Sequence, residues 1–237
     1  MKFIIAKEVF EQVEGACFGM VAARNIDNTK AVPEITGMLE QAVRDGEAYY
    51  SGRKVKEAPE ILPYREAFQK LGINPNKFMC SIEALLTRVS KGKGLPGINA
   101  AVDLGNAISV KHKVPLGAHD ADSLANGILE VRLTAPEDTF LPFGETEMEK
   151  PDAGEIVYVS NHTVRTRRWI WRQSEAGKIT EKTSAIMFPL DGFLHANKDT
   201  VIQARDELAA LLPKFFGCEV CTGFIDAENR EFEAVFT

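Results

Sequence analysis

Three short polar side chains, Asn99, Asp103 and Asn106, are spaced i, i+4 and i+7, so they would share one side of a helix. Asparagine and aspartate are poor helix formers that gain value from their position, because they can hold an amine, a hydroxyl group or a backbone segment. The spacing predicts a ligand-binding stripe. The alternative is that these side chains cap the helix and brace the loop before it, since buried Asn and Asp often satisfy backbone groups.

A second polar group follows this helix directly, in the run Val114-Pro115-Leu116-Gly117-Ala118-His119-Asp120. His119 could serve as a general base or hold a water molecule, with Asp120 or Asp103 orienting the imidazole. The alternative is a histidine that is hydrogen-bonded for structural reasons at a turn.

The segment Arg167 to Ser174 contains both tryptophans of the chain among three arginines. Alternation predicts a strand that ends at Gln173, with Arg168 and Arg172 on one face. Arginines beside aromatic rings suit phosphate pairing and base stacking. The alternative is a core strand whose indole rings fill the interior while the arginines pair with acidic residues of the body.

The charge distribution separates two basic segments from an acidic remainder. The chain has a formal net charge of -6, whereas Arg88 to Lys113 and Thr163 to Lys182 each have a clear excess of basic residues. Together they would form one positive patch for a polyanion, or else remain two solvated faces that never meet.

Composition places the chain among ordinary soluble globular proteins. It has 237 residues, of which 45% are hydrophobic and 26% charged, which excludes disordered, collagen-like and coiled-coil classes. No apolar run reaches the length of a membrane helix or of a signal-peptide core, so we expect a cytoplasmic protein. The motif Cys218-Glu219-Val220-Cys221 lacks a second ligand pair for zinc and is interpreted as part of a buried strand.

The elements that would position these residues are predicted from periodicity and turn signals. Together they indicate a mixed α/β (α+β) fold, with a mixed, largely antiparallel sheet and helices packed on it, in a single domain over residues 1–237. Expected strands cover residues 3–10, 16–24, 128–133, 156–160, 167–173, 219–225 and 233–236. Expected helices cover residues 31–48, 63–71, 98–112 and a stretch from 199 to 215, with a further helix that starts at Ser81.

Two sequence blocks resemble the editing domain of the bacterial phenylalanyl-tRNA synthetase beta chain. The first runs from Gly97 to Asn106 and continues from Val114 to Leu124; it carries an I-N-x-x-V-D-x-x-N core and a P-L-x-A-x-D-x-D-x-L tail. The second, Arg167 to Thr183, is similar to the later half of that domain in free-standing relatives. This resemblance implies a mixed α/β sandwich and a stand-alone relative of the domain that hydrolyses tyrosine wrongly attached to phenylalanine tRNA.

The chain departs from the synthetase pattern at two positions. The synthetases usually have a pocket histidine where Gly117 stands here, with His119 two residues later, and a pocket glutamate aligns near Lys178. The resemblance therefore implies the pocket architecture and another aminoacyl or amino-acid ligand, and it does not carry over tyrosine editing.

The sequence thus favours an editing-type domain that binds a tRNA 3′ end or aminoacyl-tRNA and hydrolyses a mischarged aminoacyl ester, without a metal or cofactor and without a DNA or membrane partner. The alternative is a non-catalytic amino-acid or small-molecule binding protein that kept the fold. Three groups of site residues are expected: His119 and Asp120 for catalysis; Asn99, Asp103, Asn106, Gly117, Gln173 and Ser174 for the substrate; Arg167, Arg168, Arg172 and Lys178 for tRNA.

Overall fold

The computed structural model describes residues 1–236, which contain helices and strands in irregular alternation. The helices are α1 (Lys7–Gln12), α2 (Pro33–Tyr50), α3 (Leu62–Lys70), α4 (Ser81–Val89), α5 (Ala100–His112) and α6 (Lys198–Phe216), with short 3-10 turns η1 (Val55–Glu57), η2 (Ala125–Gly127) and η3 (Glu175–Gly177). The strands are β1 (Lys2–Ile5), β2 (Ala16–Arg24), β3 (His119–Asp120), β4 (Ile128–Leu133), β5 (Ile156–Ser160), β6 (Thr163–Arg167), β7 (Arg172–Gln173), β8 (Ile186–Phe193), β9 (Glu219–Ile225) and β10 (Glu231–Glu233).

The strands form two sheets. One has the order β10-β1-β4-β5-β6-β7 and the other the order β3-β8-β2-β9. Every pair is antiparallel except β1 and β4, which run parallel. The predicted mixed, largely antiparallel fold with packed helices is confirmed, but the strands are divided between two sheets where one was expected.

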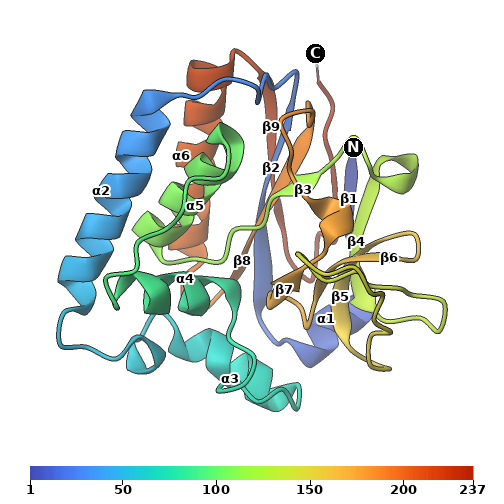
Figure 1. Ribbon diagram of the computed structural model, residues 1–237. Helices are drawn as coiled ribbons and strands as arrows, with labels where there is room; N and C mark the ends of the chain where they lie inside the picture. Colours follow the sequence, from blue (N-terminus) through green and yellow to red (C-terminus); the bar gives the residue numbers. More distant parts are fainter. Residues whose placement is uncertain (237) are drawn as a thin grey trace.

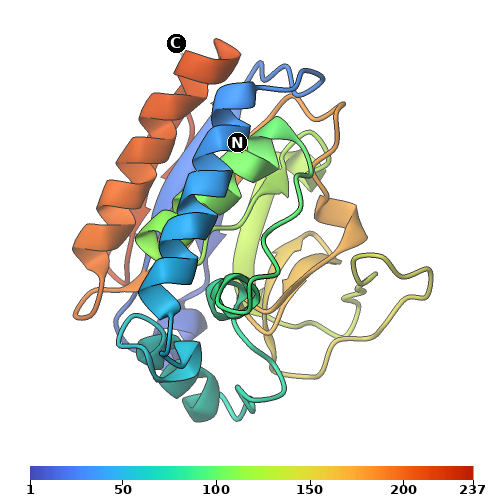
Figure 2. The same cartoon turned by 60° about the vertical axis from the view of Figure 1, so that its left-hand side comes forward.

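The two sheets face each other, and helices cover the far side of the four-stranded sheet (Figure 1). Alternate residues of β2 explain this layering. Phe18 and Met20 belong to the core between the sheets, while Val21 and Ala23 pack toward α5 and α6. Figure 2 shows α2, α5 and α6 side by side on that face. Because β2 is covered on both sides, its sequence is apolar throughout and not alternating.

Three predicted strands differ from the structure, for different reasons. Residues 3–10 divide into β1 and α1, and the Lys7–Glu11 ion pair at i, i+4, with 2.9 Å between nitrogen and oxygen, fits the helix. Residues 167–173 do not form one strand, because Arg168 and Trp169 have φ angles of 47° and 59°. The chain turns there, and the Trp169 side chain enters the core. The last strand ends at Glu233 where we expected it to begin.

Strand β8 was not predicted, although it pairs with β2 along its full length. Pro189 and Gly192 interrupt its apolar pattern, and proline normally argues against a central strand. Here the Pro189 carbonyl accepts the Gly117 N–H at 2.9 Å, along the edge of β8 that faces residues 115–119 and not β2. The missing N–H of Pro189 lies on that same side, so the ladder to β2 stays intact.

None of the helices in residues 1–236 combines the length and the apolar character needed to cross a lipid bilayer.

Candidate functional site

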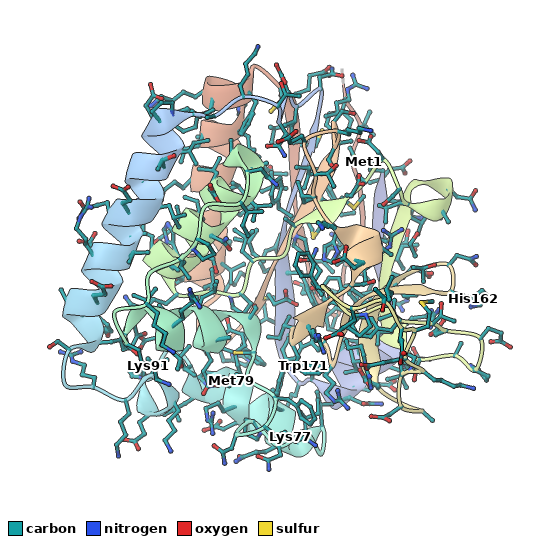
Figure 3. The ribbon with its side chains drawn as sticks, in the orientation of Figure 1. Met1, Lys77, Met79, Lys91, His162 and Trp171 are labelled. Carbon is teal, nitrogen blue, oxygen red and sulfur yellow. The ribbon has the colours of Figure 1, made fainter. Side chains whose placement is uncertain are left out.

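A cavity of about 380 Å³ lies where α4, α5, β7 and the segment 115–119 meet between the sheets. Most of its wall is apolar, and Trp171, labelled in Figure 3, forms part of it. Polar groups are concentrated in a few places. The polar residues that line the cavity are Ser81, Asn106, His119, Tyr158, Thr166, Gln173, Lys178 and Asp191.

Asp191 is the most unusual of these polar residues, because its carboxyl group is buried with no cation beside it. Tyr158 donates its hydroxyl hydrogen to Asp191 Oδ1 at 2.6 Å, and Trp169 Nε1 donates to the same oxygen at 2.7 Å. Oδ2 has no donor within residues 1–236. Burial raises the pKa of Asp191 to about 7, although both hydrogen bonds act in the opposite direction. The cavity therefore contains a hydrogen-bonding carboxyl group that is ready to change its protonation state near neutral pH.

His119 lines the cavity next to this group, and its ring stacks on Tyr158 with 5.2 Å between centroids. Burial, helped by the nearby Arg165 charge, lowers the pKa of His119 to about 3. The imidazole is therefore neutral at pH 7, and its Nδ1 is buried without a hydrogen-bond partner within residues 1–236. Neither expected aspartate orients it: Asp120 accepts from the Asp122 N–H at 3.0 Å, and Asp103 accepts from the Ile98 N–H at 2.8 Å.

Gly117 makes room for the His119 ring. A Cβ atom at position 117 would lie 3.1 Å from His119 Nε2 and 3.3 Å from Pro189 Cγ. These distances are closer than ordinary van der Waals contact. A Cβ atom at 117 would therefore press on the observed imidazole and on Pro189, which would have to shift by a few tenths of an ångström.

Four of the expected substrate or catalytic residues meet at the cavity: Asn106, Gly117, His119 and Gln173. The Asn106 amide has no hydrogen-bond partner within residues 1–236, so it is available to a ligand. Gln173 Nε2 instead donates to the carbonyls of Ala118 at 2.8 Å and Gly177 at 3.3 Å, and so holds two segments of the wall together.

The expected stripe on α5 is divided between two roles. Asn99 is the N-cap of α5, and its side chain accepts from the Val102 N–H at 3.1 Å. Asp103 braces the loop before the helix through its bond to Ile98 and does not line the cavity. For these two residues the structure favours the bracing alternative, and only Asn106 faces the cavity.

Replacing Asp103 with alanine is expected to lower the free energy of unfolding by about 1–3 kcal/mol, because the Ile98 N–H loses its acceptor. Asp103→Asn keeps an acceptor and should unfold nearly as the wild type does. Urea denaturation of the two variants measures this difference. A stable Asp103→Ala protein with impaired ligand binding would instead support the ligand contact expected from the sequence.

The two remaining residues expected for catalysis or substrate binding, Ser174 and Asp120, lie outside the cavity. Ser174 is fully buried, and its hydroxyl oxygen accepts from the Ala176 N–H at 3.0 Å as the N-cap of η3. The Asp120 carboxylate belongs to the turn that follows β3.

The cations expected to contact tRNA are largely paired with carboxylates. Arg167 is buried and makes four bonds of 2.8 to 3.3 Å to side chains of Glu149, Asp152 and Glu155. Arg168 pairs with Asp152 at 2.9 Å and lies over the rings of Phe78 and Trp171.

Arg172 and Lys178 have looser ion pairs. Arg172 approaches Glu145 at 3.3 Å, and Lys178, at the cavity, approaches Glu175 at 3.4 Å. These cations mainly fasten the acidic excursion of residues 145–155 and the η3 turn to the sheet.

The cysteines do not form a metal centre. Within residues 1–236 there is no cluster of histidine, cysteine or acidic side chains with the geometry to hold a metal ion. Cys218 packs on the helix side of the four-stranded sheet and Cys221 toward the other core, so the two side chains point to opposite faces as predicted. The strand itself differs from the prediction, because β9 begins after Cys218 and is mostly only partly buried. Burial raises the pKa of Cys218 to about 11, which makes its thiol unreactive.

The comparison with known proteins identifies a family and a similar solved structure. The model of the B3/4 domain family matches residues 63–217. An N-terminal fragment of the phenylalanyl-tRNA synthetase β-subunit from Pyrococcus horikoshii is similar, with 8% sequence identity and a TM-score of 0.49. The match covers 94% of this chain and 54% of that fragment, so the chain spans about half the fragment's length. No curated protein matches the sequence.

Proposed function

We propose a function from the fact that this chain belongs to the B3/4 domain family, which is the family of the synthetase β-subunit's editing domain. The protein would bind the 3′ end of an aminoacyl-tRNA and hydrolyse its ester. The aminoacyl group would enter the cavity beside His119, and the RNA would stay outside. Such a protein would work in the cytoplasm on tRNAs that carry the wrong amino acid.

The observation that carries this proposal is the cavity itself. Its volume of about 380 Å³ suits an amino-acid side chain, its walls are apolar, and its polar groups are few. Asn106 is free to donate to a carbonyl oxygen as negative charge develops there. The neutral His119 would hold a water molecule by hydrogen bonding through Nε2, which lies beside Gly117.

An aminoacyl ester needs little chemical help, because it is already labile. Orienting water and stabilising the oxyanion with preorganised donors is sufficient for such a reaction. A pKa of about 3 makes His119 a weak base. This mechanism fits such a histidine, because the histidine positions the water molecule and does not have to remove its proton before the attack on the ester.

Asp191 indicates the class of side chain that the cavity would accept. Asp191 Oδ2 accepts no hydrogen bond within residues 1–236, and a ligand in the cavity that supplies an N–H or O–H group would provide one. We therefore expect an amino acid with an apolar body and a hydrogen-bond donor near its tip, with aliphatic side chains disfavoured.

The second candidate is an amino-acid binding protein without hydrolytic activity. The absence of an orienting carboxylate next to His119 favours it, because a general base in esterases is normally held by such a partner. Both candidates use the same cavity, so the reaction must be tested directly.

A deacylation screen against a panel of mischarged tRNAs tests the proposed function. We expect hydrolysis of at least one aminoacyl ester, and Asn106→Ala should slow it about a hundredfold if the amide stabilises the oxyanion. Asn229→Ala, in the exposed loop before β10, is the matched control and should leave the rate unchanged. Binding of amino-acid analogues without any hydrolysis would support the second candidate. If the protein neither binds an amino-acid analogue nor hydrolyses any ester, both candidate functions are excluded.

A further inference from the structure

The region between Arg53 and Lys93 is basic within an acidic protein. It contains nine lysines and arginines and four glutamates, whereas the whole chain has a net charge of -6. This region comprises η1, α3, α4 and their connections. Charge patterning in the sequence pointed to Arg88–Lys113 and Thr163–Lys182, so the concentration of charge in this part of the structure was not expected.

The cations border a hollow of about 340 Å³ beside α4, which we call the basic groove. Figure 3 labels two residues of its lining, Met79 and Lys91, along the lower part of the molecule. The basic residues of the lining are Arg53, Lys54, Lys56, Arg65 and Lys91.

Three of the four glutamates of this region have a partner, and the fourth, Glu66, is exposed but does not line the groove. Glu83 is buried, and Arg65 Nη1 lies 2.5 Å from its Oε1. Glu57 pairs with Lys54 at 3.1 Å, and Glu60 accepts the Tyr50 hydroxyl hydrogen.

The other three basic residues of the lining keep their charge available. Arg53, Lys56 and Lys91 are exposed and have no carboxylate within 4.0 Å in the part of the chain that the structure describes. The groove is therefore positive on balance. The arginines near β6 and β7 differ, because acidic partners neutralise them.

Helix α4 separates the basic groove from the cavity. Ser81 and Leu85 line the cavity, whereas Glu83 and Thr87, on another side of the same helix, line the groove. The two sites are thus about one helix diameter apart, roughly 10 Å. The loop after α4 connects them, since Lys91 borders the groove and Ile98, which is 59% exposed, borders the cavity.

We propose that the basic groove binds phosphates of the RNA strand whose aminoacylated 3′ end enters the cavity. This inference rests on the proposed function and names the surface that would hold its partner. Two lysines and an arginine without carboxylate partners around one hollow suit the phosphates of a nucleic-acid backbone. The position of the groove about one helix diameter from the cavity favours an RNA strand over a lipid bilayer, because the same strand would carry the aminoacyl group into the cavity.

Salt-dependent binding of deacylated tRNA tests the proposal. The double variant Lys56→Glu/Lys91→Glu should bind at least tenfold more weakly at low salt. The slope of log affinity against log salt should fall by about two, one for each lost phosphate contact. Lys150→Glu/Lys214→Glu carries the same charge change on other parts of the surface and should bind like the wild type. Thermal melting of both variants checks that they are folded.

Equal tRNA binding by the groove variant and the wild type would overturn the proposal, and so would absence of binding by the wild type. If the groove variant loses binding to phosphatidylserine vesicles while its tRNA binding is unchanged, the groove binds a membrane instead. Hydrolysis of 3′-aminoacyl-adenosines by the wild type needs only the cavity, so it tests the proposed function separately from the groove.

Discussion

Asp191→Asn is expected to make the protein more stable at pH 8 and, at the same time, less able to bind its ligand. The asparagine can still accept the hydrogen bonds of Tyr158 and Trp169, so packing should be preserved. What disappears is a buried negative charge without a cation. Loss of a charged hydrogen bond to the ligand should weaken binding about ten- to a hundredfold.

The gain in stability depends on pH with a definite sign. The pKa of Asp191 is about 7 in the folded protein, against 3.8 in a free chain. Between pH 4 and 7 the folded state therefore holds a proton that the unfolded state has released, and stability falls as the pH rises. Above pH 7 the full penalty is present, on the order of 4 kcal/mol.

His119 contributes a pH dependence of opposite sign. Its pKa is lowered to about 3, so its contribution to stability is lost as the pH falls from 6.5 toward that value. The wild type and Asp191→Asn must therefore be compared at the same pH, so that the contribution of His119 to the free energy of unfolding cancels.

Chemical denaturation of both proteins at pH 5 and pH 8 measures the effect. The variant should be clearly more stable at pH 8, and the difference should shrink at pH 5. A variant that is less stable at pH 8 would mean that Asp191 is a structural carboxylate, and unchanged ligand affinity would remove it from the site.

Arg167→Met is expected to destabilise the protein by about 3–5 kcal/mol, because it leaves the buried Glu155 without its cation. Methionine keeps most of the apolar length of the arginine side chain, so the change isolates the charge. The expected result separates a structural arginine from one that contacts RNA.

Arg172→Met is the matched control for this experiment. Its ion pair with Glu145 is largely exposed, and such pairs contribute at most about 1 kcal/mol. Urea denaturation measures both variants. If Arg167→Met retains its stability but loses tRNA binding, the RNA contact expected from the sequence is correct and the ion-pair network is dispensable.

The periodicity of apolar residues was sufficient to predict an element wherever that element buries one face or has a long apolar run. Strand β2 was predicted with its observed bounds, and α6 follows from the spacing of Val201, Ala204, Leu208 and Leu212 along one buried side. It failed where tertiary contacts decide the backbone. Trp169 adopts a left-handed conformation because its indole reaches Asp191 across the core, and no local pattern contains that information.

The same limit explains the candidate site. Asn106, Gly117, His119 and Gln173 could be found because they stand in short polar motifs. Asp191 could not be found in this way, because it belongs to β8, and Pro189 and Gly192 interrupt the apolar pattern by which that strand would be predicted. The pairing of Arg167 was also hidden, because its three carboxylates lie 12 to 18 residues away along the chain.

The tight fit between a Cβ atom at 117 and the imidazole of His119 bears on how such pockets should be searched for. The synthetase motif that this chain resembles has its histidine where Gly117 stands, so a position-by-position comparison scores that group as missing. The space next to Gly117 nevertheless contains an imidazole nitrogen, supplied from two residues further along the chain. A search template built from atoms in space would therefore retain pockets that a template built from alignment columns discards.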